Sequence, residues 1–88
     1  KEADDGSVRG VVRAGGRLNV REAPQAGARI IDQLANGAEV RIYARAPDGL
    51  WLVTEVVDEE TGRLILAWVM ARYVALEGDV EDLPVKEP

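Results

Sequence analysis

Turn residues recur along this sequence at intervals of about 8–12 residues, and that spacing restricts the fold more than any other feature. Gly15-Gly16, Asn36-Gly37 and residues 47–49 each separate two short runs rich in Val, Ile and Leu. Such residues favour tight turns between antiparallel strands. The sequence therefore predicts an all-β fold of five to seven short antiparallel strands. For a body of roughly 70 residues, a small closed or nearly closed barrel fits better than a sandwich.

The alternation of apolar with charged or aromatic residues locates the strands. In residues 38–46, Val40, Ile42 and Ala44 fall on one face, as expected for a strand with one buried side. Residues 15 and 16 are predicted to join the first two strands as a tight hairpin. The other predicted strands span residues 8–14, 17–21, 29–34, 50–57 and 64–70, and residues 71–76 are predicted to form one 3₁₀ turn and a last short strand.

The charged residues divide the chain into three parts. The formal net charge is −5, but nine arginines face eight acidic residues between residues 7 and 76, so the excess of acids lies at the two ends. Acidic ends with little apolar material favour segments without a packed structure. The predicted organisation is an acidic lead-in at residues 1–7, a barrel at residues 8–76, and an acidic, proline-containing tail or linker at residues 77–88.

The composition disfavours catalysis and metal binding. The chain has no Cys and no His, which removes the thiolate nucleophile, the commonest general base and the commonest metal ligand. Three consecutive acids at residues 58–60 lack the alternating ligands and the Gly of a calcium loop, so they are interpreted as a polar hairpin tip. No enzyme activity, catalytic residue, metal site or cofactor is therefore expected.

Other features bear on the surroundings of the chain. No run of about 18 apolar residues is present, so no membrane span is expected in this fragment. The sequence does not begin with Met and shows no signal peptide, so it is expected to be part of a longer protein. Arginines alternate with apolar residues in the body, but acids are interspersed with them. A solvated face is therefore favoured over a nucleic-acid surface, and no nucleic-acid partner is expected.

The order of motifs along the chain resembles the bacterial SH3-type domain. The pattern of that family opens with Leu-Asn-Val-Arg, here residues 18–21, followed by a proline, here Pro24, and the resemblance covers about residues 11–76. Ala67 stands where the family usually has Gly, and Met70 stands where eukaryotic relatives have a groove proline. The resemblance implies an SH3-like barrel. Further matching positions are Ile30, Ile31, Leu34, Asn36, Gly37, Val40, Asp48, Gly49, Trp51, Thr54, Trp68, Val69, Tyr73 and Val74.

The resemblance also implies a function. Bacterial domains of this type usually belong to larger exported proteins, which implies an extracytoplasmic location, either periplasmic, at the cell surface or secreted. Some bind cell-wall peptide crosslinks, which implies a non-catalytic module that docks to cell-wall peptide, to peptidoglycan or to a protein segment. Stacking and carboxylate pairing would suit a short peptide or a glycan stem. The candidate ligand-binding residues are Glu22 and Gln25 in the loop after the opening motif, with Trp51, Arg72 and Tyr73.

Alternatives stay open for the aromatic residues and for the role of the domain. Trp51 and Tyr73 can equally belong to the core, whereas the strand context of Trp68 favours burial. Proline-motif binding of the eukaryotic kind is disfavoured because residues 17–23 contain no aromatic side chain. The competing hypothesis is a purely structural spacer or oligomerisation domain with no ligand of its own. Exposed Trp51 and Tyr73 would favour docking, and buried ones a structural role.

Overall fold

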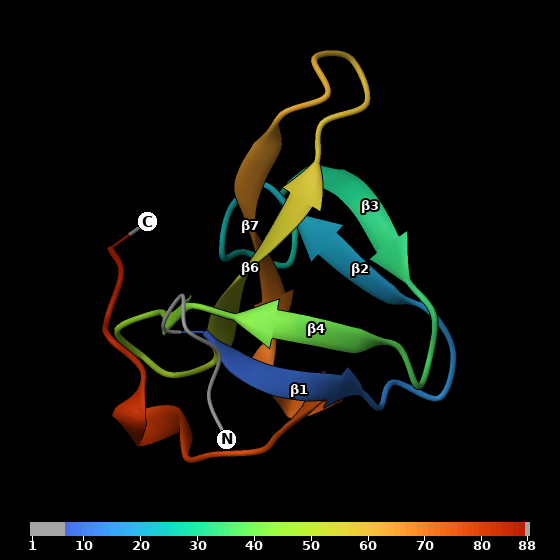
Figure 1. Ribbon diagram of the computed structural model, residues 1–88. Coiled ribbons are helices and arrows are strands. Elements are labelled where there is room, and N and C mark those ends of the chain that lie inside the picture. The colour runs from blue at the N-terminus through green and yellow to red at the C-terminus, as the bar shows by residue number, and fades with distance from the viewer. Residues whose placement is uncertain (1–6, 88) are drawn as a thin grey trace.

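The computed structural model describes residues 7–87 and shows two antiparallel sheets around a common core (Figure 1). Their strand orders are β4-β1-β8 and β3-β2-β7-β6-β5. The strands are β1 Val8–Val12, β2 Leu18–Arg21, β3 Ile30–Leu34, β4 Glu39–Ile42, β5 Ala44–Arg45, β6 Trp51–Val57, β7 Leu64–Met70 and β8 Val74–Leu76, and the 3₁₀ turns are η1 Ala71–Tyr73 and η2 Val80–Asp82. The predicted all-β fold and small SH3-like barrel are confirmed. Residues 1–6 of the predicted lead-in lie outside the described residues, and Ser7 is buried.

The interior of the barrel follows from the alternation seen in the sequence. Val40 and Ile42 of β4 are buried in the core, as their positions on one face predict, and burial of apolar surface is the main stabilising term for such a domain. The run predicted as one strand at residues 38–46 is divided at Tyr43, whose backbone N–H donates to Val53 O at 2.9 Å. The chain therefore passes from the small sheet at β4 to the large sheet at β5.

The predicted hairpin at Gly15 and Gly16 is wrong. β1 pairs with β4 and β8, whereas β2 pairs with β3 and β7, so the two strands beside the glycines lie in different sheets. Gly15 has a positive φ of 74°, and the backbone N–H groups of Ala14 and Gly15 both donate to Asn36 Oδ1. The glycines do redirect the chain, but a local turn signal does not determine which strands pair on either side of it.

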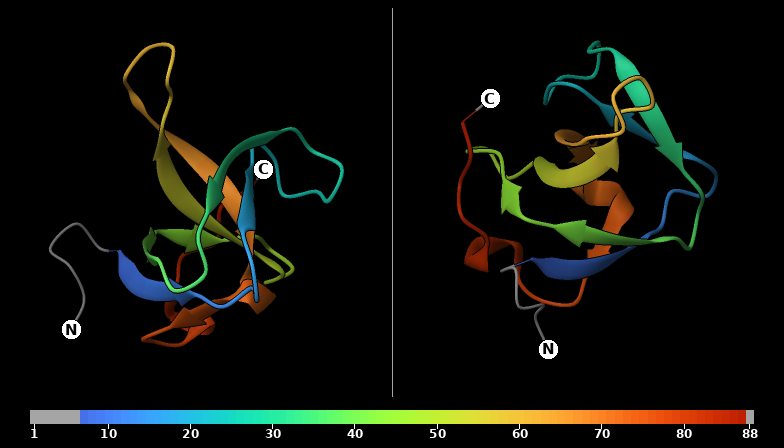
Figure 2. Two further views of the ribbon diagram at one scale, coloured as in Figure 1. Left: turned by 90° about the vertical axis from the view of Figure 1, so that its right-hand side faces the viewer. Right: turned by 45° about the horizontal axis from the view of Figure 1, so that its top comes forward.

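The described part of the tail packs against the barrel and is not a free linker (Figure 2). Leu83 is 3% exposed and belongs to the core. Arg45 N donates to Pro84 O at 2.9 Å and Lys86 N donates to Arg45 O at 2.8 Å, so the tail runs parallel to β5 along its outer edge. A single Leu among acids produces no apolar periodicity, which is why the sequence pattern does not reveal this contact.

A second apolar cluster lies on the outer face of the five-stranded sheet. The register of β6 and β7 pairs Val53 with Trp68 and Trp51 with Met70, and residues paired across antiparallel strands point to the same face. Both tryptophans are buried in this cluster with two alanines from the region of β5. The prediction that Trp68 is buried is therefore confirmed. Trp51, which the sequence left as either a core residue or an exposed binding residue, is also buried.

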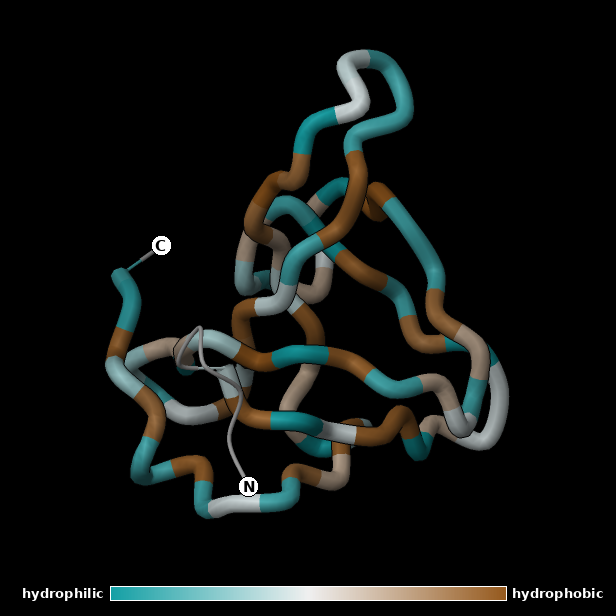
Figure 3. Tube along the Cα trace, in the orientation of Figure 1, coloured by the Kyte–Doolittle hydropathy of each residue, from teal (hydrophilic) through white to brown (hydrophobic). Residues whose placement is uncertain are grey.

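The β6–β7 hairpin extends beyond the body of the barrel (Figure 1). Val57, Leu64 and Leu66 are exposed on its arms, and strand alternation places them on the same face as the outer cluster. Figure 3 shows apolar residues on both arms below a largely hydrophilic tip. Apolar surface of the hairpin is therefore exposed to solvent among the described residues.

Candidate functional site

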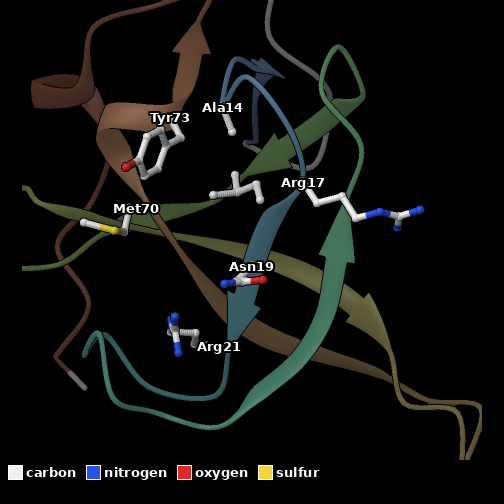
Figure 4. Close-up of a pocket in the computed structure, with 7 residues that line it drawn as sticks. Ala14, Arg17, Asn19, Arg21, Met70 and Tyr73 are labelled. Atoms are coloured by element: carbon white, nitrogen blue, oxygen red, sulfur yellow. The ribbon is translucent and has the colours of Figure 1, made fainter.

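A groove of about 220 Å³ lies where the start of β2 meets the end of β7 and η1 (Figure 4). Arg13 N donates to Tyr73 O at 2.8 Å, which fixes the 3₁₀ turn η1 against the segment that leads into β2. Ala71 N donates to Leu50 O at 2.9 Å, which fixes the same turn against the segment that leads into β6. The residues lining the groove are Ala14, Arg17, Leu18, Asn19, Arg21, Met70 and Tyr73.

One wall of the groove is polar and comes from β2. Asn19 and Arg21 are two residues apart in the strand, so they point to the same face. Gln33 Nε2 donates to Asn19 Oδ1 at 2.9 Å. The oxygen of the Asn19 amide is therefore turned toward β3, and its nitrogen is turned toward the groove (Figure 4).

Arg21 joins the polar wall to the loop between β2 and β3. Its Nη1 donates to Ala28 O at 2.8 Å, and Glu22 N donates to Arg29 O at 3.0 Å at the base of the same loop. The guanidinium group has five N–H donors, so this single bond orients the side chain and leaves further donors for a ligand. The loop and the polar wall therefore form one connected unit.

The opposite wall is apolar and aromatic. It is formed by Met70 at the end of β7 and by Tyr73 in η1, whose ring is half-buried. The Arg72 guanidinium carbon lies 5.3 Å from the centre of the Tyr73 ring, within the range of a cation–π contact. This wall offers one flat ring and one flexible thioether to an apolar part of a ligand.

The structure does not bring all five predicted site residues together. Tyr73 lines the groove, and Arg72 stacks on its ring. Trp51 is 7% exposed, belongs to the outer cluster and does not line the groove. Glu22 and Gln25 are exposed in the β2–β3 loop, outside the lining. A ligand contact of either loop residue stays a prediction.

Of the seven residues that line the groove, Tyr73 alone was a predicted site residue, and the other six were not. Asn19 and Arg21 share one face of the opening motif because they alternate with apolar residues. Strand alternation predicts this polar face, but it does not indicate that the face borders a groove. Met70 gave no comparable signal, because it reaches the groove only after β7 has paired beside β2.

A second hollow of about 310 Å³ separates the start of β3 from the β6–β7 hairpin. Apolar side chains of β3, β6 and β7 line it together with Arg29 and the acidic hairpin tip. The residues lining it are Arg29, Ile30, Ile31, Val56, Val57, Asp58, Glu59, Glu60 and Ile65.

The described residues hold neither a cluster of metal ligands nor a membrane-spanning helix. Within residues 7–87, no group of three or more potential ligands is arranged to hold a metal ion. Within the same range, no helix has the length and apolar character needed to cross a membrane. The consecutive acids at the hairpin tip form a turn in which Glu60 N donates to Asp58 Oδ1 at 2.9 Å.

Comparison with known proteins identifies a family. The family model described as bacterial SH3 domain matches residues 16–75, which is more than half of the chain. No curated protein and no solved structure matches the sequence. The matched range begins just before β2 and ends within β8, so it contains every residue that lines the groove except Ala14.

Proposed function

Because the chain belongs to the bacterial SH3 domain family, we propose that it is a non-catalytic docking module of a larger, exported protein. The family is one of binding domains, and its members often occur in extracytoplasmic proteins. The proposed ligand is a cell-wall peptide, and the proposed binding site is the groove between β2, β7 and η1.

The observation that supports this site is the pairing of two unlike walls in one groove. Tyr73 and Met70 offer apolar contact, and Asn19 and Arg21 offer hydrogen-bond donors. Small peptide sites combine these features, because apolar contact contributes affinity and a few placed polar groups set orientation. A proline-rich ligand of the eukaryotic kind fits less well, because β2 carries no aromatic residue with which to cradle it.

Cosedimentation with purified bacterial sacculi tests the proposal. Asn19→Asp is the informative variant, because it keeps the oxygen that accepts from Gln33 and replaces the groove-facing NH₂ by oxygen. Asn36→Asp is the matched control, because it makes the same exchange at a residue outside the groove lining. Retention of the wild type and of Asn36→Asp, with loss of Asn19→Asp, is the expected result. A wild-type chain that stays in the supernatant would contradict docking to the cell wall.

Trp51→Ala is a poor probe of this site. The side chain is buried in the outer cluster, so truncation would change stability and binding together. Each variant is therefore compared at a temperature where its unfolding curve shows a fully folded population. Under that condition, loss of retention reports on the groove and not on folding.

A second candidate function is packing against a neighbouring domain or a second copy. The burial of Trp51 favours it over docking. The exposed Val57, Leu64 and Leu66 on the hairpin also favour it, because a contiguous apolar surface on a small domain often marks an interface. Sedimentation velocity over a range of concentrations tests the second-copy form of this role. Self-association that Leu64→Glu abolishes would support it, and a monomer at every concentration would argue against it.

A further inference from the structure

Among residues 7–87, the lining of the groove contains hydrogen-bond donors and no carboxylate. Arg17 and Arg21 can only donate, and Asn19 presents its NH₂ group because its oxygen already accepts from Gln33. The Tyr73 hydroxyl can also donate. A ligand that matches this wall must therefore supply acceptors.

Among the residues that the structure describes, the arginines around the groove also lack a partner of opposite charge. The ion pairs among residues 7–87 join Arg9 to Glu39 and to Glu77, on another part of the molecule. Within the same residues, no carboxylate lies at ion-pairing distance from Arg17, Arg21 or Arg72. In a chain with a formal net charge of −5, this leaves a local positive region beside an apolar wall.

We infer that the groove binds a carboxylate of an extended peptide, an assignment that rests on the docking function proposed above. Arg21 and Asn19 donate to the two carboxylate oxygens, since such charge-assisted bonds are short and strong. The neighbouring apolar part of the peptide packs on Tyr73 and Met70. Arg17 points away from the other side chains that Figure 4 labels, and it contributes long-range attraction.

Either of two sources can supply this carboxylate, and their chemistry at the groove is the same. One is an acidic side chain within the peptide, and the other is a free carboxyl terminus. Four N-acetylated peptides distinguish them. Gly-Ala-Glu-Ala-amide is compared with Gly-Ala-Gln-Ala-amide, and Gly-Ala-Ala-Ala with a free terminus is compared with its amide. Within each pair, only the carboxylate changes.

Titration of the ¹⁵N-labelled 88-residue chain followed by NMR measures the four affinities. At least one acid peptide is expected to bind about tenfold more tightly than its amide partner and to shift the Asn19 NH₂ and Arg21 Nε–H signals. Its affinity is expected to fall as the pH is lowered through the ordinary pKa of a peptide carboxyl, about 4. The pair that shows the difference identifies the source of the carboxylate.

Variants at Asn19 and Asn36 separate the groove from the rest of the surface. Asn19→Asp is expected to lower the affinity for that acid peptide about tenfold, and Asn36→Asp is expected to leave it within about twofold, since charge-assisted bonds are lost only in the first variant. Acid and amide peptides that shift the groove signals with equal affinity would overturn carboxylate selection and leave docking intact. No shift with any of the four peptides would also overturn it, and sacculus binding would then decide separately whether docking stands.

Discussion

Asn19 and Gln33 face each other across β2 and β3, and the Gln33 side-chain amide donates a hydrogen bond to Asn19 Oδ1 at 2.9 Å. This bond determines which end of the Asn19 amide points into the groove. Gln33 does not line the groove itself. A residue outside the site therefore sets whether one wall offers donors or acceptors to a ligand.

Gln33→Glu is expected to weaken binding of the acidic peptide without loss of stability. A carboxylate at this position accepts a hydrogen bond, so the Asn19 amide would turn its nitrogen toward β3 and its oxygen into the groove. The affinity is expected to fall about tenfold, as a charge-assisted bond is lost. The free energy of unfolding should change by less than about 0.5 kcal/mol, because position 33 is exposed. NMR titration and urea unfolding measure the two quantities.

Two comparisons control this prediction. Gln33→Ala removes the hydrogen bond without reversing the Asn19 amide, so it is expected to give an intermediate loss of affinity. Asn36→Asp adds the same negative charge at a residue that does not line the groove. Equal binding by Gln33→Glu and the wild type would contradict the orientation of Asn19 described here.

Trp51→Ala is expected to lower the stability of the domain more than it lowers its affinity for the peptide. The side chain is 7% exposed and packs with Trp68 and Val53. Truncation of a buried Trp to Ala costs about 3–5 kcal/mol, which corresponds to a fall in Tm of 10 °C or more for a domain of about this size. Calorimetry measures it. An unchanged Tm together with lost peptide binding would instead restore Trp51 as a ligand-binding residue.

The positions of the strands could be predicted from the sequence, but the partners of strands that pair over long sequence distances could not. The alternation around Val40 and Ile42 and the turn at Asn36-Gly37 place strands within a few residues of those observed. These are local signals. The partners of β1 are β4 and β8, which are distant in sequence, so the glycines at residues 15 and 16 indicate a change of direction and not a pairing.

The site could be predicted only where the family resemblance supplied a residue. Tyr73 was identified in this way and lines the groove. The alternation of residues 18–21 predicts that Asn19 and Arg21 share one face, but it does not indicate that this face borders a groove. Met70 and the Gln33–Asn19 bond depend on which strands lie side by side, and this information is not contained in any short window of the chain.

Gly10→Ala is expected to destabilise the barrel by about 1–3 kcal/mol through overpacking. Gly10 lies in β1, where it pairs with Val40 of β4 and Leu76 of β8. A Cβ atom added there would lie 2.7 Å from Val74 Cγ1 and 3.4 Å from Ala75 O. Urea unfolding of the variant measures the effect.

A double variant separates this contact from a general effect of alanine in a strand. The Val74→Ala substitution removes the atom nearest to the added Cβ. Gly10→Ala is therefore expected to cost less free energy of unfolding in the Val74→Ala background than in the wild type. Gly16→Ala meets no atom within 4 Å and is expected to change stability by less than about 0.5 kcal/mol. A Gly10→Ala chain as stable as the wild type would mean that Val74 moves aside at little cost.

Leu83→Ala tests whether the tail belongs to the folded domain. Leu83 is 3% exposed and packs in the core, although it lies beyond the last strand of the barrel. Truncation of a buried Leu costs about 2–5 kcal/mol. Val85→Ala is the matched control, because Val85 is 49% exposed only two residues further on, and its expected cost is below about 0.5 kcal/mol.

Removal of residues 77–88 extends the same test to the backbone. It deletes Leu83 and also the hydrogen bonds between Arg45 and the tail at Pro84 and Lys86. The truncated chain is therefore expected to be less stable than Leu83→Ala, with a lower urea midpoint and faster amide hydrogen exchange at Arg45. If the truncated chain unfolds at the same urea concentration as the full chain, the tail is a linker after all, and the domain ends at Leu76.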